Sequence, residues 1–390
     1  MRLLLSLLTC LSIATAVVSA EPSSTDNVQA AIHSGDARMR SVNLGGWLVS
    51  EYWLSYSSSL FAGIPDRELA RRGEYGIMNY LGRTAGTAAF EKHRQTWIDE
   101  SHIAAIAAAG LNAVRVPVGY WIVCDDDSSG YSFGLRAGCA KTEADADASS
   151  VPINKYARGS LKYLDALVND WAPRHNIAVM LSLHAHAGGQ NAYEHSAPES
   201  AGKYSWLESD ANRANSLSYD DQLGLLNKYY EAVYNSIRVS GGDCIVALSP
   251  FIHQQDAINL RKLLPDTSKG YTNVWHELHP YFIWGYANWA EPDILAFITK
   301  YRDETLKVAA GNSNNRLMLG EWSMGGPPDE SGIYSDMTNF RELGRRQLEY
   351  FNEYATGGWA FWTWRHSDDS IGKRTGWSMR ALLGSGDLVL

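Results

Sequence analysis

Short apolar runs alternate with longer segments of helical periodicity along most of the chain. The apolar runs are almost unbroken, as in strands that are covered on both faces, and they lie at 42–49, 112–118, 177–184, 244–250, 274–281, 316–322 and 358–364. Between them, apolar positions recur every three or four residues, which predicts helices over 88–110, 159–172, 218–242, 291–310 and 336–355. Strands that alternate with helices in this way indicate parallel β/α units.

This order of elements predicts an α/β fold of the (β/α)8, or TIM, barrel type. The pattern supplies seven strands, and the polar stretch 185–219 contains neither a strand nor a helix pattern. Because an uninterrupted loop of that length is uncommon in a compact domain, we expect the fourth β/α unit to be missing there. No repeat or linker divides the remainder, so residues 41–390 are interpreted as a single barrel domain.

The first residues indicate the compartment. They carry an early Arg2, a short apolar stretch and the small-residue ending Val18-Ser19-Ala20. This pattern predicts a signal peptide at 1–20, followed by a polar, flexible lead-in at 21–40. We therefore expect a secreted protein of the extracellular space or the cell wall, without a membrane span.

Composition narrows the class of ligand. The formal net charge of −9 gives no electrostatic footprint for nucleic acid or for an anionic membrane. Aromatic residues make up 11% of the chain and include 14 Trp, and aromatic faces suit neutral sugars. None of the cysteines is arranged as in a zinc site, and we expect a monomer.

Polar and aromatic residues recur where the predicted strands end, which is where catalytic groups gather in such barrels. In chain order they are Glu51, Trp53, Arg115, His184, His279, Tyr281, Glu321, Trp362 and Trp364. Each has a structural alternative, because the arginine could lie at the rim and the histidines and tryptophans could belong to the core. Their convergence at one end of the sheet favours a functional site.

Glu321 is the most informative of these residues. In "RLMLGEWSMGG" it ends a buried run, where an unpaired charge is costly. An inward-pointing Arg115 would keep this carboxylate ionised. An ionised, desolvated carboxylate is a good nucleophile for the anomeric carbon of a sugar.

Six motifs resemble the secreted exo-β-1,3-glucanases of glycoside hydrolase family five: "VNLGGWLVSEYW", "GLNAVRVPVGYW", "LHAHAGGQNAYEHS", "HELHPY", "GEWS" and "GWAFWTWR". They occur in the family's order, from about residue 40 to about residue 380. The resemblance implies a (β/α)8 barrel and retaining hydrolysis of β-1,3-glucan without a metal or other cofactor. Glucose would be released from the non-reducing end.

The same resemblance implies a role for each residue. Glu321 would be the nucleophile and Arg115 its positioning partner. The residues that would line the cleaving subsite are His184, His279 and Tyr281, with the Tyr281 hydroxyl hydrogen-bonded to the nucleophile. The residues that would bind substrate are Glu51, Trp53, Trp362 and Trp364. Of these, Glu51 would hydrogen-bond to the terminal glucose and Trp364 would stack on it.

The second carboxyl group that retaining hydrolysis needs is missing from this pattern. It should lie about 5–5.5 Å from the nucleophile, and in the family it belongs to an Asn-Glu-Pro motif that ends the fourth strand. This chain has no such motif, and its Asn352-Glu353 pair falls in a helical pattern. Two weak substitutes are Glu277, which faces the barrel one layer deeper, and Glu194 on the loop above the pocket.

Three hypotheses therefore stay open. The protein is an exo-β-1,3-glucanase, active in a form that contains the fourth strand, and this chain is an incomplete gene model or splice form that joins near Ser216–Leu217. Alternatively it is a non-catalytic β-glucan-binding relative that has lost the acid. The third hypothesis is a structural or surface-interaction barrel with vestigial carboxylates. Within the first, transfer of glucosyl groups remains an alternative to hydrolysis.

Overall fold

The computed structural model describes residues 27–124, 156–186, 188–198, 219–264, 270–311, 315–327 and 333–390. These ranges include all seven stretches for which strands are predicted, and they extend to the last residue, Leu390. The predicted signal peptide and the join near Ser216–Leu217 lie outside the described residues.

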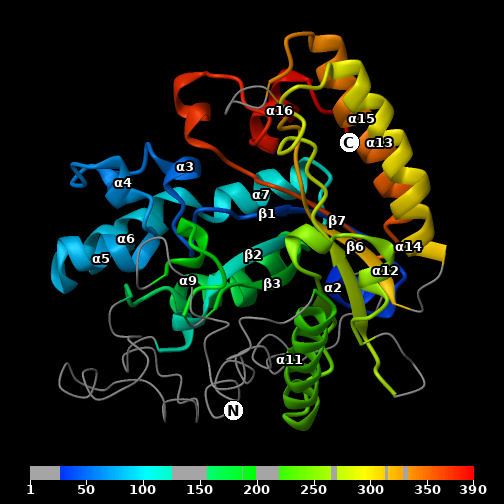
Figure 1. The fold of residues 1–390 in the computed structure, drawn as a ribbon. Helices are drawn as coiled ribbons and strands as arrows, with labels where there is room; N and C mark the ends of the chain where they lie inside the picture. Colours follow the sequence, from blue (N-terminus) through cyan, green and yellow to red (C-terminus); the bar gives the residue numbers. More distant parts are fainter. Residues whose placement is uncertain are drawn as a thin grey trace.

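Seven parallel strands form one sheet (Figure 1). They are β1 (Met39–Asn43), β2 (Ala113–Gly119), β3 (Ala178–Ala185), β4 (Val246–Leu248), β5 (Val274–Leu278), β6 (Arg316–Trp322) and β7 (Gly358–Phe361). All seven predicted strands are present, which confirms the α/β class. The first strand lies earlier than the predicted 42–49, because the chain leaves the sheet after Asn43 and turns at Gly46, whose φ is +70°.

The sheet curls into an incomplete barrel. Its strand order is β3-β2-β1-β7-β6-β5-β4, so the first and last strands of the chain are neighbours at its centre. Ser41 of β1 lies opposite Ala113 on one side and Ala360 on the other. Among the described residues, β3 and β4 are the two edges, and no ladder joins them. This gap lies where the sequence predicts a missing fourth strand.

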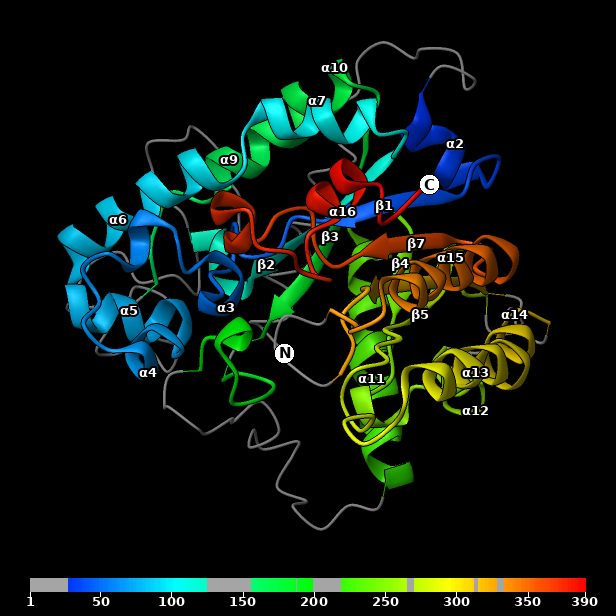
Figure 2. The ribbon, with the colours of Figure 1, turned by 90° about the horizontal axis from the view of Figure 1, so that it is seen from above.

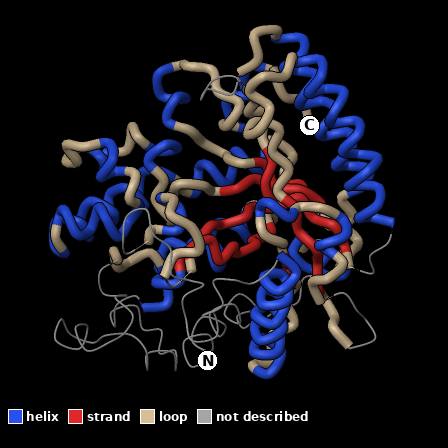
Figure 3. Tube along the Cα trace, in the orientation of Figure 1, coloured by secondary structure: helices blue, strands red, loops and turns tan. Residues whose placement is uncertain are grey.

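Helices surround the sheet, as the view from above and the tube drawing show (Figures 2 and 3). They are α2 (Val28–Ser34), α3 (Tyr52–Ser55), α4 (Arg67–Ala70), α5 (Gly73–Leu81), α6 (Arg83–Trp97), α7 (Glu100–Ala108), α9 (Leu161–Ala166), α10 (Ala172–Arg174), α11 (Tyr219–Val239), α12 (Ala257–Leu260), α13 (Glu291–Tyr301), α14 (Lys307–Gly311), α15 (Met337–Tyr354) and α16 (Met379–Ser385). Short π-helical turns, η7 (Leu167–Trp171) and η13 (Arg302–Leu306), connect α9 to α10 and α13 to α14. No helix within the described ranges combines the length and apolarity that a membrane crossing needs.

The helix predicted over 88–110 is two helices, α6 and α7. Asp99 starts the second one: its carboxylate accepts the N–H of Ser101 at 2.9 Å, and its own N–H donates to the His102 ring. Such a capping box ends one helix and begins the next inside a continuous apolar pattern. The other predicted helices are confirmed, and α11 and α15 fill most of the ranges 218–242 and 336–355.

The lead-in predicted as flexible at 21–40 contains a helix and the start of β1. The Asn27 side chain caps α2 by accepting the N–H of Ala30 at 3.1 Å. Ile32 is buried and belongs to the same apolar cluster as Trp275 and Met318. The helix therefore covers the amino-terminal end of the barrel, a role that the polar residues around it in the lead-in obscure.

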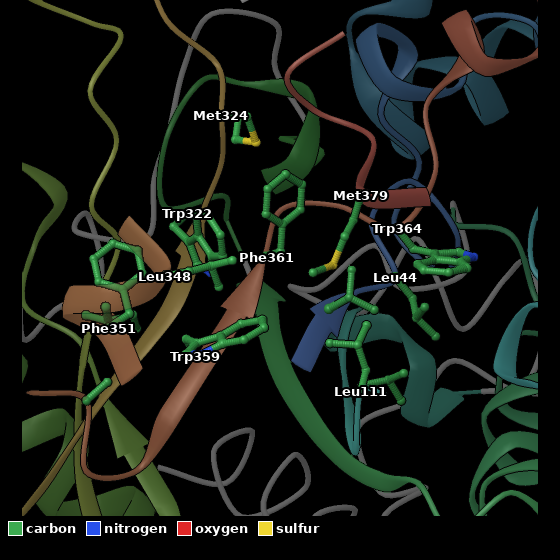
Figure 4. Close-up of a cluster of buried hydrophobic side chains, with 14 of the residues drawn as sticks. Leu44, Leu111, Trp322, Met324, Leu348, Phe351, Trp359, Phe361, Trp364 and Met379 are labelled. Carbon is green, nitrogen blue, oxygen red and sulfur yellow. The ribbon is translucent and has the colours of Figure 1, made fainter. Parts of the chain in front are cut away.

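The main core lies between the sheet and the outer helices (Figure 4). Trp322 of β6 packs edge-on against Phe361 of β7 and Phe351 of α15, with ring centroids 4.8 and 5.3 Å apart. Burial of these large rings is the dominant stabilising contribution on this side of the sheet.

The strands beside the gap between β3 and β4 are not all equally buried. Every residue of β2 is buried, whereas β3 is buried only at its two ends and half-buried from Val179 to His184. Parallel strands are normally covered on both faces. The edge of β3 therefore has the incomplete cover expected of a strand that lacks its next neighbour.

Candidate active site

A cavity of about 2630 Å³ extends from the carboxyl ends of the strands to the amino-terminal end of the sheet, where Asn27 and His33 line it. Its walls include eight of the nine residues predicted for the site, namely Glu51, Trp53, Arg115, His184, His279, Tyr281, Glu321 and Trp362. The cavity continues through the gap between β3 and β4 to apolar side chains of α11, among them Leu226 and Val233. The predicted site and the gap in the sheet are thus one continuous space.

Glu321, at the end of β6, is 8% exposed and is held on both oxygens. Its Oε1 accepts from Arg115 Nη1 at 3.0 Å, and its Oε2 accepts from the Tyr281 hydroxyl at 2.9 Å. Burial raises the pKa of this carboxyl, but His279, Arg115 and the other neighbours outweigh burial and lower the pKa to about 2. Glu321 is therefore an ionised carboxylate at neutral pH, with its geometry fixed by two donors.

Asn43 holds the arginine in place and was not identified from the sequence. It ends β1, where it lies opposite Arg115 in the ladder, and its Oδ1 accepts from Arg115 Nη1 at 2.8 Å. Its Nδ2 donates to the carbonyl of Gly320, next to the nucleophile, at 3.0 Å. One buried amide thus links β2 to β6. The signal available in the sequence was a lone polar residue inside the apolar run "VNLGG".

Glu277 does not fit the role of a spare acid. Arg115 Nη2 lies 2.9 Å from its Oε1, and His279 Nε2 lies 2.9 Å from the same oxygen. Burial raises the pKa of Glu277, but Arg115 and His279 outweigh it and lower the pKa. Gly320 makes this position possible, because a Cβ there would lie 1.6 Å from Glu277 Oε1. A carboxylate that its neighbours hold in the ionised form, Arg115 foremost among them, is a poor proton donor.

The two histidines flank the nucleophile at longer range. His184 Nδ1 lies 3.9 Å from Glu321 Oε1, and His279 Nδ1 lies 3.7 Å from Glu321 Oε2. Burial lowers the pKa of His184 to about 3, so that its ring is neutral at neutral pH. A neutral ring can donate or accept a hydrogen bond from a substrate hydroxyl without adding charge.

The two tryptophans at the end of β7 lie in different places. Trp362 lines the cavity and stacks on His184, with ring centroids 5.3 Å apart and planes 11° apart. Trp364 is not among the residues that line the cavity; it is 2% exposed and belongs to the core with Leu44 and Met379 (Figure 4). The strand ends at Phe361, so the alternation that would put both rings on one face does not continue. Of the two rings, Trp362 therefore faces the cavity, whereas Trp364, which the resemblance implied as the stacking ring, packs in the core.

Substitution of the two tryptophans should separate sugar binding from stability. Trp362→Ala is expected to weaken binding of a β-glucoside roughly tenfold, because it removes an aromatic face beside the reacting centre. Trp364→Phe should lower the melting temperature and leave the dissociation constant unchanged, since it only reduces core packing. Calorimetric titration measures the dissociation constant of each variant, and thermal unfolding measures its melting temperature. A weakened sugar affinity in Trp364→Phe at full folding would contradict this placement.

Glu51 and Trp53 follow β1 and face the same cavity. Glu51 is 1% exposed, and its Oε2 accepts from the Trp53 indole N–H at 3.0 Å. Burial raises the pKa of Glu51 well above its ordinary value, and the nearby charges of Glu194 and Glu321 raise it further. Its Oε1 has no hydrogen-bond partner within the described structure. These surroundings favour the neutral form of the Glu51 carboxyl, and its Oε1 is the oxygen that the described residues leave unpaired.

Further aromatic side chains extend the wall and were not identified from the sequence. The Trp377 ring lies 5.1 Å from Trp53 and 5.9 Å from Tyr281. Trp284, which also lines the cavity, is 67% exposed at its mouth. Only the folded chain brings these rings together, because they come from loops that follow different strands.

The described residues offer no metal site, because no group of three or more His, Cys, Asp or Glu side chains has a suitable arrangement.

Six described carboxyl groups line the cavity: Glu51, Asp243, Glu194, Glu277, Glu321 and Asp368. Glu194 is engaged by backbone amides, since its Oε2 accepts the N–H of Tyr52 at 2.6 Å. Asp368 is occupied by Tyr56, His366 and Lys373.

Comparison with known proteins agrees with this architecture. No family model matches the chain. The chain is homologous over most of its length to proteins named as glucan 1,3-beta-glucosidases. It is 25% identical to "Probable glucan 1,3-beta-glucosidase A" of Emericella nidulans, over 90% of this chain and 89% of the relative. It is 23% identical to "Glucan 1,3-beta-glucosidase" of Blumeria graminis, over 86% and 84%.

Solved structures share the fold at lower identity. The rutinosidase of Aspergillus niger matches with a TM-score of 0.63 and 15% identity, over 90% of this chain and 98% of that one. A glycoside hydrolase family 5 enzyme of Prevotella bryantii matches with a TM-score of 0.51 and 14% identity, over 93% and 97%. These matches establish that the curled sheet is a TIM-barrel fold that lacks closure between β3 and β4 in the described residues.

Proposed function

We propose that this protein is a retaining glycoside hydrolase of the exo-β-1,3-glucanase type, secreted to the extracellular space or the cell wall. The observation that carries the proposal is the buried, ionised Glu321, fixed by Arg115 and Tyr281 and facing a large aromatic-lined cavity. The choice of β-1,3-glucan as substrate is supported by the names of the homologous proteins.

The proposed first step is attack of Glu321 on the anomeric carbon. A bond forms between a Glu321 oxygen and that carbon, and the bond to the leaving sugar oxygen breaks. Arg115 and the Tyr281 hydroxyl hold the carboxylate in line, and as the negative charge moves to the leaving group they remain paired with the ester oxygens. Water then hydrolyses the ester, which regenerates the Glu321 carboxylate and releases glucose with the configuration retained; the proton that the water loses balances the one that the leaving oxygen takes up.

The remaining residues are assigned to substrate binding. His184 and His279 flank the nucleophile and are placed to meet hydroxyl groups of the sugar that is cleaved. Trp362 supplies the face on which the ring stacks, and Glu51 with Trp53 holds its far hydroxyls. Trp284, at the mouth of the cavity, extends the aromatic surface toward the leaving part of the glucan.

We infer that this form of the chain lacks the Asn-Glu-Pro proton donor that the family resemblance implies. The sequence contains no Asn-Glu-Pro, and Glu277 and Glu194 are both engaged elsewhere. The open edges of β3 and β4 support the absence of a unit between them.

A fluorinated glucoside with a dinitrophenolate leaving group tests the nucleophile directly, because such a leaving group needs no proton. Incubation followed by peptide mass spectrometry should find the fluoroglucosyl group on Glu321. A label on another residue would overturn the assignment.

The second candidate function is that of a non-catalytic β-glucan-binding relative. It is favoured by the missing proton donor together with the intact aromatic wall. Binding of laminari-oligosaccharides without any label on Glu321 would support this candidate over the first. Absence of both binding and labelling would leave a structural barrel.

A further inference from the structure

Glu194 lies in the turn η8 (Glu194–Ser196) after β3 and is 8% exposed. Both of its carboxylate oxygens point to the start of α3, more than a hundred residues earlier in the chain. Oε2 accepts the N–H of Tyr52 at 2.6 Å, and Oε1 accepts the N–H of Trp53 at 3.5 Å. The first amides of a helix have no partner within it, so Glu194 caps α3 from a distant segment.

This capping leaves Glu51 available to the cavity. Glu51 occupies the position before α3, and its side chain makes no cap hydrogen bond. Its Oε2 instead accepts from the Trp53 indole N–H, and its Oε1 stays unpartnered among the described residues. Glu194 thus satisfies the α3 amides that the Glu51 side chain does not reach.

The turn that carries Glu194 is itself held tightly. The Ser196 hydroxyl donates to the carbonyl of Asn191 at 2.6 Å, and the Tyr156 hydroxyl donates to the carbonyl of Ala197 at 2.9 Å. Gly73, with φ +69°, packs so closely that a Cβ would lie 2.3 Å from the Glu194 carbonyl oxygen. Glu194 is thus a fixed anchor for α3.

We propose that Glu194 is a positioning residue of the sugar pocket, which by capping α3 holds the Glu51 carboxyl and the Trp53 indole in their binding orientation. The inference rests on the proposed function, because it assumes that these two groups meet a sugar. It replaces the sequence-based hypothesis that Glu194 substitutes for the missing acid.

The electrostatic surroundings add a pH-dependent signature. Burial raises the pKa of Glu194 to about 7, although the Tyr52 and Trp53 amides and the cations Arg71 and Arg67 oppose the rise. Glu51 is the carboxyl that faces it. The pKa of Glu194 in the folded protein exceeds its ordinary value of 4.5. The contribution of Glu194 to the free energy of unfolding is therefore complete below about pH 4.5 and is lost as the pH rises through 7. Glu194→Gln, which cannot ionise, should remove this part of the pH dependence of the melting temperature.

The test compares Glu194→Ala, Glu194→Gln and a matched control, Asp336→Ala. The Asp336 carboxylate caps α15 by accepting the N–H of Thr338 at 2.7 Å, and Asp336 does not line the cavity. All three are made in the full chain. The first readout is the dissociation constant for laminaribiose. The second is the indole N–H resonance of Trp53, assigned by its loss in Trp53→Phe, which reports the hydrogen bond to Glu51 without any sugar.

Glu194→Ala is expected to weaken laminaribiose binding tenfold or more and to shift the Trp53 indole resonance. Glu194→Gln should restore binding to within about threefold, because its amide oxygen still accepts from Tyr52. Asp336→Ala should lower the melting temperature while both readouts stay unchanged. An unchanged Trp53 resonance in Glu194→Ala would overturn the positioning role. A wild-type chain that binds no laminaribiose would instead contradict the proposed function, and the resonance would still decide the positioning role.

Discussion

Glu321→Gln is expected to reduce hydrolysis of 2,4-dinitrophenyl β-glucoside by on the order of 10⁴-fold or more, because an amide cannot form the glucosyl ester. Dinitrophenolate departs without a proton, so this substrate reports the nucleophile even in a chain without a general acid. The measurement is the initial rate of dinitrophenolate release, compared with the rate in enzyme-free buffer.

The fold should tolerate this substitution for a specific reason. Removal of one partner from a buried ion pair usually costs about 3–5 kcal/mol, because the other charge is left alone. Here Arg115 keeps Glu277 at 2.9 Å, so its charge stays paired when the charge of Glu321 is removed. The melting temperature should therefore change little.

Glu277→Gln is the matched control for charge. It also removes one of the two carboxylates around Arg115, but it leaves the nucleophile in place. We expect it to retain most of the dinitrophenyl glucoside activity. If Glu277→Gln lost as much activity as Glu321→Gln, the assignment of the nucleophile to Glu321 alone would be wrong.

Insertion of a family-like β/α unit of about 30 residues between Ser216 and Leu217 is expected to raise laminarin hydrolysis about 10²–10⁴-fold. This is the usual range for a general acid, and the strand would end in Asn-Glu-Pro. The inserted strand would pair with the open edges of β3 and β4, which the described sheet leaves unjoined. Its helix would cover the half-buried face of β3. Closure should also raise the melting temperature, because an open edge disturbs the shear that closes an eight-stranded barrel.

The control for this insertion carries glutamine in place of the motif glutamate. It should gain the same thermal stability and recover no laminarin hydrolysis, which separates closure of the barrel from proton donation. Sodium azide should then restore turnover of an activated glucoside, because azide needs no general base to attack the ester. Full laminarin activity in the 390-residue chain itself would contradict the absence of a proton donor.

Genomic sequence across the codons for residues 205–225 gives an independent check. An intron-like stretch that encodes an apolar strand ending in Asn-Glu-Pro would support the missing β/α unit.

The sequence alone determined the strands and the core of the site. Runs of apolar residues mark buried parallel strands, and such strands end on one side of the sheet. Glu321 and Arg115 could therefore be paired before the structure was known, and they lie 3.0 Å apart. The sequence also predicted the gap that the described residues leave between β3 and β4, because the polar stretch 185–219 has no periodic pattern. These features follow from local patterns that repeat within a few residues.

The tertiary structure decided which side chains share a partner. Trp362 and Trp364 lie two residues apart, but the strand ends before them, and only the surrounding core shows that Trp364 packs away from the cavity. Glu277 faces the barrel as alternation predicts, but its carboxylate forms an ion pair with Arg115. Glu194 caps a helix that begins 142 residues earlier. A side chain's face follows from local periodicity, whereas its charge and role depend on contacts between segments that are far apart in the sequence.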